Sequence, residues 1–341
     1  MIIPFFILLI KLLKMNHGQL YQFLNYLRRK DAIGDTISGD EYNRIAPIVA
    51  YKLFKKYMGL PEQYQKGSRD AVFGLGLNAI SEEKIRPLKK YGEVITIAGT
   101  GLADYPADYF RMSSCYYIHV AGSVTRNIIV PFVNDSKFNE RRATVLDPPS
   151  VTEPVWNLNS DKIRFLPVTL GNVTLDYIKL PTEPVMGYVV NSDTGELIYV
   201  DHGAYCQILT PGTVGNVITL TVGAVTLGSY TVVSGDTVED VMLGLRDDIN
   251  TETLTHNVTA VYDGTKIVLI DAGETYTTLT ATPTGTITLN KSNFTSWSTQ
   301  FDWENDIESM NEIAELMLDM MGISNRDMNL VQWAEKEKAN G

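Results

Sequence analysis

The chain of 341 residues is poor in the residue types that most often carry chemistry, with two cysteines and four scattered histidines. Cys115 and Cys206 form no Cys-x-x-Cys pair, so neither a disulfide framework nor a thiolate metal site is predicted. No His-x-x-x-His, Cys-His cluster or Gly-x-Ser-x-Gly turn occurs. We therefore predict no enzyme, no cofactor and no metal site. A Ser-His-Asp triad assembled from distant positions is the alternative that local spacing leaves open.

Positive charge is also scarce. The net charge is −11 and the isoelectric point is about 4.9, which argues against a protein whose main task is to grip nucleic acid, because phosphate binding needs clustered Lys and Arg. Residues 203–291 carry nine acidic and three basic side chains, a net charge of −6. We expect no measurable binding of double-stranded DNA at physiological salt.

Long hydrophobic runs are absent as well. The opening stretch "MIIPFFILLIKLLK" is apolar only from Ile2 to Ile10 and contains Pro4, about half of the roughly 20 residues that a membrane span needs. Its lysines follow the run and no small-residue cleavage site comes after it, so a secretory signal is not favoured either. We predict no membrane partner. Residues 1–14 are interpreted as an apolar N-terminal extension, either ahead of a natural start at Met15 or packing on a partner.

What the chain does contain is typical of a folded α+β protein of two domains, with 44% hydrophobic and 20% charged residues. We predict a helical core formed by the N- and C-terminal segments with a β-rich middle. Helices are expected in 15–90 and 303–339, and strands in 91–202. The core would comprise 15–202 and 292–341, and 203–291 would be an inserted β-rich module with one short helix.

The helical ends carry start signals and apolar faces. "SGDE" at Ser38–Glu41 is a capping box, and behind it an apolar face recurs at helical spacing, with Pro47 expected to kink the helix. Asn305 is the expected cap of a second helix, with Gly322 as its end. The residues expected to form the first face are Tyr42, Ile45, Val49, Leu53 and Phe54.

The second helix carries a methionine stripe that admits two interpretations. Methionines at helical spacing are most often buried core, but they also form adaptable binding faces. As candidate partner-interface residues we take Met310, Met317, Met320, Trp333 and Tyr109.

The middle of the chain reads as strands and hairpins. "VVNSDTGELIYV" predicts a hairpin that turns at Asp193-Thr194-Gly195, and "YDGTK" predicts another at an Asp-Gly turn. Between them "VEDVMLGLRDDINT" predicts the short helix of the module. Asp263 and Asp271 could bind calcium, but EF-hand spacing is absent and turn chemistry explains both.

The chain resembles a known protein family in the order of its segments, although no single motif is diagnostic. "DTISGDEYNRIAPIVAYKLFKKYMGLPEQYQ", "ADYPADYFRMSS", "LDYIKLPTEP" and "FDWENDIESMNEIAELMLDMMGISNRDMNLVQWAE" together resemble the head–tail connector or ring proteins of crAss-like and related Bacteroidetes-infecting tailed bacteriophages. The resemblance covers about 15–200 and 292–341, and in that family the chain typically begins where Met15 stands. The segment 203–291 is similar instead to a β-module that recurs in phage tail and virion proteins.

The resemblance implies a virion structural protein that is assembled in the host cytoplasm and sits at the head–tail junction. It implies a homo-oligomeric ring, of twelve copies, stacked below the portal and against other ring or tail proteins, with DNA passing through its lumen. A second hypothesis is an adhesion or carbohydrate-binding module on the insert. Its stacking platforms would be Tyr205, Tyr230, Tyr262 and Tyr276.

Overall fold

The computed structural model describes residues 15–30, 36–58, 83–121, 124–144 and 148–321. Helices and several antiparallel sheets occur together, so the chain has a mixed α+β fold. It divides into two compact units, 1–53 with 182–341 (unit 1) and 54–181 (unit 2). This division falls elsewhere than the domain boundaries expected from the sequence, which stay a prediction.

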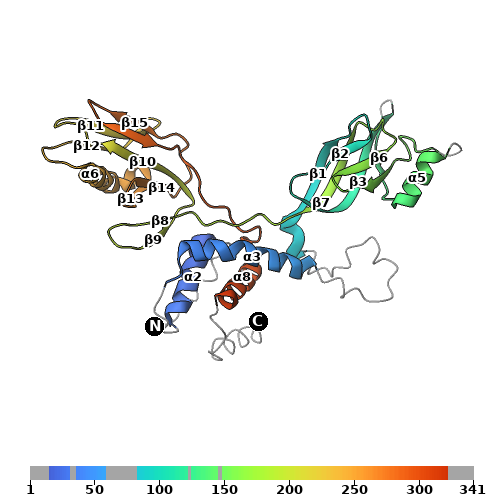
Figure 1. The fold of residues 1–341 in the computed structure, drawn as a ribbon, viewed down its shortest axis with the longest axis horizontal. Helices are drawn as coiled ribbons and strands as arrows, with labels where there is room; N and C mark the ends of the chain where they lie inside the picture. Colours follow the sequence, from blue (N-terminus) through green and yellow to red (C-terminus); the bar gives the residue numbers. More distant parts are fainter. Residues whose placement is uncertain (1–14, 31–35, 59–82, 122–123, 145–147, 322–341) are drawn as a thin grey trace. The chain divides into compact units, whose positions relative to one another are not determined.

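The described residues of the N- and C-terminal segments include three helices (Figure 1). They are α2 (His17–Lys30), α3 (Gly39–Met58) and α8 (Ile307–Met320), and α2 contacts α8. The backbone N–H of Glu41, in the first turn of α3, donates to the Ser38 hydroxyl at 3.1 Å, which is one of the two hydrogen bonds of the predicted capping box. Of the expected face, Ile45 alone is only half-buried. Tyr42, Val49, Leu53 and Phe54 are buried.

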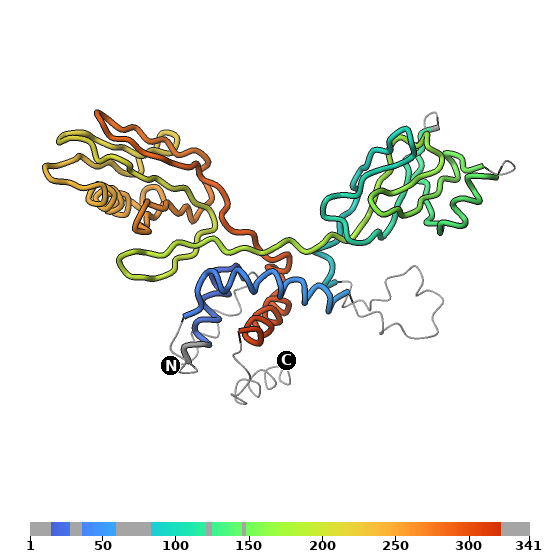
Figure 2. Tube along the Cα trace, in the orientation of Figure 1, coloured from blue at the N-terminus to red at the C-terminus, as the bar shows by residue number. Residues whose placement is uncertain are grey.

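Hydrogen bonds join segments that lie far apart along the chain. Segments 182–187 and 297–301 lie side by side (Figure 2), with the backbones of Val185 and Thr299 paired. Asn43 on α3 both donates to and accepts from the backbone of Met186, at 2.9 and 2.8 Å. The Met15 N–H donates to the carbonyl of Glu304. Sequence positions more than 100 residues apart are thereby held together by directional bonds.

The hairpin expected around Gly195 is confirmed. Strands β8 (Tyr188–Val190) and β9 (Leu197–Tyr199) pair antiparallel, and Gly195 in the connecting turn has a positive φ of 69°, a conformation that glycine adopts at no steric cost. Ser192 in the turn donates its N–H to the carbonyl of Tyr262, and Arg246 forms an ion pair with Asp193. The hairpin is thus fastened to the segment that follows it.

The β-rich module begins at β10 and contains two sheets and the expected helix. One sheet has the order β13-β14-β10-β16, with β17 also paired to β10, and the other has the order β12-β11-β15. Helix α6 contacts strands of both sheets. The strands and helices are β10 (His202–Thr210), β11 (Val217–Val222), β12 (Val225–Thr231), α6 (Val238–Thr251), α7 (Thr253–His256), β13 (Val258–Tyr262), β14 (Ile267–Asp271), β15 (Thr280–Pro283), β16 (Thr288–Lys291) and β17 (Thr295–Ser296).

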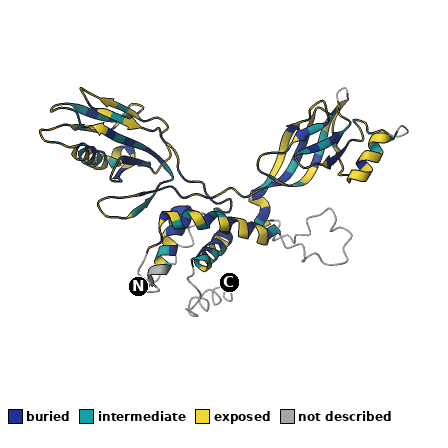
Figure 3. Ribbon diagram, viewed as in Figure 1, coloured by how far each residue is buried: buried dark blue, intermediate teal, exposed yellow. Residues whose placement is uncertain are grey.

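The module forms one hydrophobic core, and α6 closes it. The residues of α6 that face this core recur every three or four positions, as an amphipathic helix requires. The Thr237 hydroxyl accepts from the Asp240 N–H and the Asp240 carboxylate accepts from Thr237 in return, a complete capping box. Figure 3 shows strands that alternate between buried and exposed residues. The buried residues of α6 are Val241, Met242, Leu245 and Ile249.

Unit 2 packs a four-stranded sheet, β1-β7-β3-β4, against a three-stranded sheet, β2-β6-β5. One cluster holds buried side chains of both sheets, including Val173 and Leu175 from the first and Ile163 and Phe165 from the second. A short 3-10 turn, η3 (Arg86–Leu88), precedes the sheets. The other elements are β1 (Lys89–Thr96), β2 (Leu102–Asp104), β3 (Tyr109–Ala121), β4 (Val124–Ile129), α5 (Asp135–Ala143), β5 (Val155–Leu158), β6 (Lys162–Leu166) and β7 (Asn172–Lys179).

One local expectation is wrong. The cap of α8 is Asp306 and not Asn305, because the Asp306 carboxylate accepts the N–H of Glu308 at 3.2 Å. The stretch 91–202 is rich in strands, as expected, and also contains the helix α5, which the sequence did not predict and whose cap Asn134 accepts the N–H of Lys137. Pro47 lies inside α3 without ending it.

Candidate interaction surfaces

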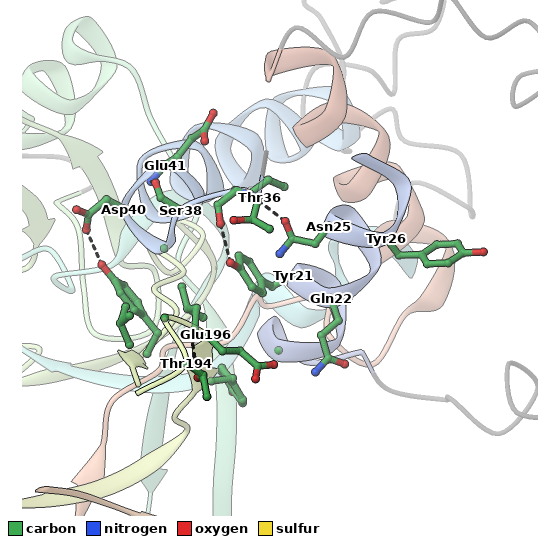
Figure 4. Close-up of a pocket in the computed structure, with 18 residues that line it drawn as sticks. Tyr21, Gln22, Asn25, Tyr26, Thr36, Ser38, Asp40, Glu41, Thr194 and Glu196 are labelled. Atoms are coloured by element: carbon green, nitrogen blue, oxygen red, sulfur yellow. Dashed lines mark hydrogen bonds between the residues drawn. The ribbon is translucent and has the colours of Figure 1, made fainter. Parts of the chain in front are cut away.

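A groove in unit 1 lies between the helices and the hairpin (Figure 4). Its volume is about 1080 Å³, and its walls come from α2, the segment before α3, the first turn of α3, and both strands and the turn of the hairpin. Four tyrosines and three carboxylates line it, and none of its eighteen lining residues is Lys, Arg or His. The tyrosines are Tyr21, Tyr26, Tyr188 and Tyr199, and the carboxylates are Asp40, Glu41 and Glu196.

Two glycines bring the hairpin against the helices. A Cβ on Gly39, at the start of α3, would lie 2.5 Å from the Tyr188 ring. A Cβ on Gly18, in α2, would lie 2.8 Å from the Tyr199 ring. Real side chains do not approach that closely, so only glycine at these two positions lets the rings lie on the helical backbone. This packing sets the width of the groove at its hairpin side.

Hydrogen bonds fix the polar groups of the groove. The Tyr188 hydroxyl donates to Asp40 at 2.7 Å, and this bond to a carboxylate is the largest cause of the raised pKa of Tyr188. The Tyr21 hydroxyl donates to the Ile37 carbonyl at 2.6 Å, while Asn25 accepts the Ile37 N–H. Burial raises the pKa of Tyr199 to about 12. The phenols of Tyr188 and Tyr199 are therefore neutral at pH 7, and the charged side-chain types among the lining residues are Asp and Glu.

The outer face of the four-stranded sheet in unit 2 is the second candidate surface. Cross-strand partners point to the same face, and Val94, Thr174, Tyr116 and Ile129 form one row across the four strands. The row beside it, which includes Val173, is buried in the core. Ile118 and Val120 continue the outer face along β3. The exposed fractions are 58% for Val94, 46% for Ile118, 63% for Val120 and 75% for Ile129.

The sequence of β3 contains a signal for this face. In "YYIHVAG" both alternating sets of β3 are largely apolar or aromatic, a pattern typical of a strand covered on both sides. In unit 2 the side that includes Cys115 is buried in the core, whereas the opposite side is exposed. The groove gave no comparable signal, because its lining residues come from separate segments joined only by the fold.

The predicted interface residues lie mostly inside the protomer. Met310 and Met317 are fully buried, which supports the core interpretation of the stripe, and Met320 is half-buried. Tyr109 lies between the rings of Tyr105 and Tyr177, with centroids 4.8 and 5.8 Å away. Trp333 lies outside the described residues. A role of these residues in a partner interface stays a prediction.

The four tyrosines expected to form a sugar-binding platform do not share one exposed face. Tyr262 is buried, and Tyr230 and Tyr276 pack against the core of the module. The Lys266 ammonium lies 5.1 Å from the centre of the Tyr205 ring. These four rings therefore do not form the cluster of exposed aromatic side chains that would favour a carbohydrate site.

The acidic turns bind their own backbone. Asp263 accepts the N–H groups of Thr265 and Lys266, and Asp271 accepts those of Gly273, Thr275 and Tyr276 at 2.6–3.0 Å. These bonds are the turn chemistry of aspartate. Among the described residues, no group of three or more His, Cys, Asp and Glu side chains could hold a metal ion.

Two of the described histidines, His17 and His256, make structural contacts. The Nε2 of His17 lies 2.8 Å from the Thr299 carbonyl, and its Nδ1 lies 2.7 Å from the Tyr42 hydroxyl. Because a carbonyl only accepts, Nε2 carries the proton and Nδ1 accepts from Tyr42. Burial lowers the pKa of His17 to about 4. The His256 Nδ1 accepts the backbone N–H of Val258.

His202 is the histidine that lies near an aspartate. Its Nδ1 is 3.5 Å from the Asp271 carboxylate, which already accepts three backbone N–H groups.

No protein-family model matches the chain, and no curated protein matches it. The helices within the described residues are all too short or too polar to cross a membrane.

Proposed function

We propose that this chain is a virion structural protein that forms a ring in the head–tail connector of a tailed bacteriophage. The ring would contain about twelve copies, sit below the portal in contact with other ring or tail proteins, and let DNA pass through its lumen. The helices of the N- and C-terminal segments would form the core of each subunit, as expected from the resemblance. The module would project from that core and contact neighbours.

The observation that carries the proposal is the outer face of the four-stranded sheet. Val94, Ile118, Val120 and Ile129 are exposed on this face, beside the polar cross-strand partners Thr174, Asn127 and Thr125. Several exposed apolar side chains rimmed by polar ones are typical of an interaction surface. A second protein surface that covers this face would remove the apolar side chains from water. Each such side chain, fully buried, contributes about 1.5–3 kcal/mol. A self-associating subunit accounts for the face better than an isolated binding module does.

The acidic composition is compatible with passage of DNA. A surface rich in Lys and Arg would grip the duplex by releasing counterions, whereas acidic surfaces repel it within a Debye length of about 8–10 Å. The net charge of −11 favours a channel that conducts DNA without holding it.

The mass of the assembled protein tests the proposal. We expect mass photometry of the intact chain, at increasing concentration, to reveal a closed oligomer of the 38.0 kDa subunit. Replacing Val120 and Ile129 together with lysine should dissociate it, because two charges would be buried in the interface. Leu254→Lys, at a fully exposed leucine of the module, is the matched control and should assemble normally. A chain that stays monomeric at every concentration contradicts the proposal.

A further inference from the structure

The two units differ in charge. Unit 2 contains 16 Lys and Arg against 13 Asp and Glu, a net charge of +3, while unit 1 contains 13 against 27, a net charge of −14. Two copies of such a chain attract each other most strongly when unit 2 of one faces unit 1 of the other. Complementary potentials of this kind select orientation and speed encounter. The charge division therefore favours contact between unlike surfaces.

The groove of unit 1 contains part of the negative charge of this unit. Its three carboxylates come from two separate elements, the first turn of α3 and the turn of the hairpin, and its tyrosine rings include Tyr26, which is 62% exposed. Carboxylates together with exposed aromatic faces suit Lys and Arg side chains, which form charge-assisted hydrogen bonds and stack on rings. The groove is therefore suited to bind a segment that carries Lys or Arg side chains.

Helix α5 of unit 2 presents such a segment. Of its nine residues only Phe138 is buried, beneath the Arg164 guanidinium at 4.9 Å. Lys137 and Arg142 are exposed, and Arg141 and Arg142 form the basic last turn. A helix with side chains is about 10–12 Å wide and rises 5.4 Å per turn, so one turn occupies roughly 400–600 Å³. The groove, at about 1080 Å³, has room for one turn or slightly more.

We propose that the last turn of α5 in one copy docks into the groove of a second copy, with Arg142 facing Asp40, Glu41 and Glu196. The inference rests on the proposed ring and specifies one of its contacts. Groove and helix are different surfaces, so the contact is heterologous, and heterologous contacts close into rings when the rotation between neighbours allows it. The apolar sheet face and this polar contact would then be separate parts of the assembly.

Cross-linking between two labelled populations of the full chain tests the contact. One population carries Glu196→Cys and the other Arg142→Cys; the native Cys115 and Cys206 are buried and stay unreactive under mild oxidation. After mixing, we expect disulfide-linked pairs that join one chain of each population. Asp161→Cys, at an exposed position of unit 2, replaces Arg142→Cys in the control mixture and should give none. Links within the Glu196→Cys population alone would indicate a two-fold contact and overturn the inference.

Charge reversal provides the second readout. Glu196→Lys and Arg142→Glu should each raise the dissociation constant of the assembly about tenfold, equivalent to about 1.4 kcal/mol, and the double variant should recover most of that loss. Assembly that is indifferent to both changes, without mixed cross-links, would overturn this contact and leave the ring proposal standing. A chain that never assembles would overturn both.

Discussion

The module and unit 2 each contain two antiparallel sheets and a few helical segments, but they differ in what the sheets leave exposed. In the module, α6 contacts strands of both sheets, and the inward residues of β10, β11 and β14 belong to one core. In unit 2, α5 contributes only Phe138 to the buried residues, and the outer face of the four-stranded sheet keeps Val120 and Ile129 exposed.

The difference indicates where each region obtains its stability. A sheet with apolar residues on both faces hides the second set only when another surface covers it. In the module this second set, which includes Val261 and Val268, is buried against Val189 and Val200 of the same chain. The module together with the preceding hairpin is therefore expected to be self-sufficient, whereas unit 2 is expected to gain from a partner.

Truncation of one buried and one exposed side chain tests this difference most strongly. Leu245→Ala, in the core of the module, should lower the free energy of unfolding by about 2–5 kcal/mol, because it removes apolar contacts and leaves a cavity. Ile118→Ala, on the outer face of unit 2, should change it by less than about 0.5 kcal/mol in the dissociated chain. Urea denaturation measures both. Equal losses would mean that the outer face is covered within the protomer.

The module was the part of the fold that the sequence predicted best. The bounds of α6 agree with the predicted helix, because its apolar residues keep helical spacing and Thr237 supplies an N-cap. The turn at Asp263 likewise produced the predicted hairpin between β13 and β14. Local chemistry determines such elements, so a local pattern reveals them.

Elements that depend on distant partners were not predictable in this way. Helix α5 has one apolar residue, Phe138, and therefore no periodicity to detect. The position of β7 between β1 and β3 follows from pairing across more than 50 residues. The groove depends on Tyr188 and Tyr199 meeting Gly39 and Gly18, which are contacts between segments that no sequence spacing connects.

Acid should distinguish the helical part of unit 1 from both β-rich regions. The pKa of His17 is lowered to about 4 by burial, against about 6.5 in an unfolded chain, so the unfolded chain binds the extra proton between these values. Stability should therefore fall as pH decreases from 6.5 to 4, by about 3 kcal/mol at most. Urea denaturation at a series of pH values between 6.5 and 4 measures this loss in the free energy of unfolding. His17→Asn should flatten the slope, and His119→Asn, in unit 2, should retain it.

Adding one methyl group at Gly244 of the module should lower the free energy of unfolding more than adding one at Gly99 of unit 2. A Cβ on Gly244 in α6 would lie 2.1 Å from the Tyr230 ring, whereas a Cβ on Gly99 would meet nothing within 4 Å. Gly→Ala in a helix normally stabilises by about 1 kcal/mol. We expect Gly244→Ala to destabilise instead, by about 1–3 kcal/mol through overpacking, and Gly99→Ala to be nearly neutral. The melting temperatures of both variants test this expectation. A higher melting temperature for Gly244→Ala would contradict it and would mean that the Tyr230 ring moves aside without cost.

The smallest expected difference lies at the two helix caps. Thr237 caps α6 through a complete capping box, and Asn134 caps α5 through one bond to Lys137. Removing a cap typically costs about 1 kcal/mol. Because α6 is packed into the module core, Thr237→Ala should lower the global stability of the module by that amount. Helix α5 buries only Phe138, so Asn134→Ala should fray the helix while leaving global unfolding unchanged within about 0.5 kcal/mol. Hydrogen exchange separates the two outcomes, since fraying speeds exchange in 135–143 alone. If α5 docks on a neighbouring copy, assembly should restore its protection, and exchange that stays fast in the assembled protein would contradict that docking.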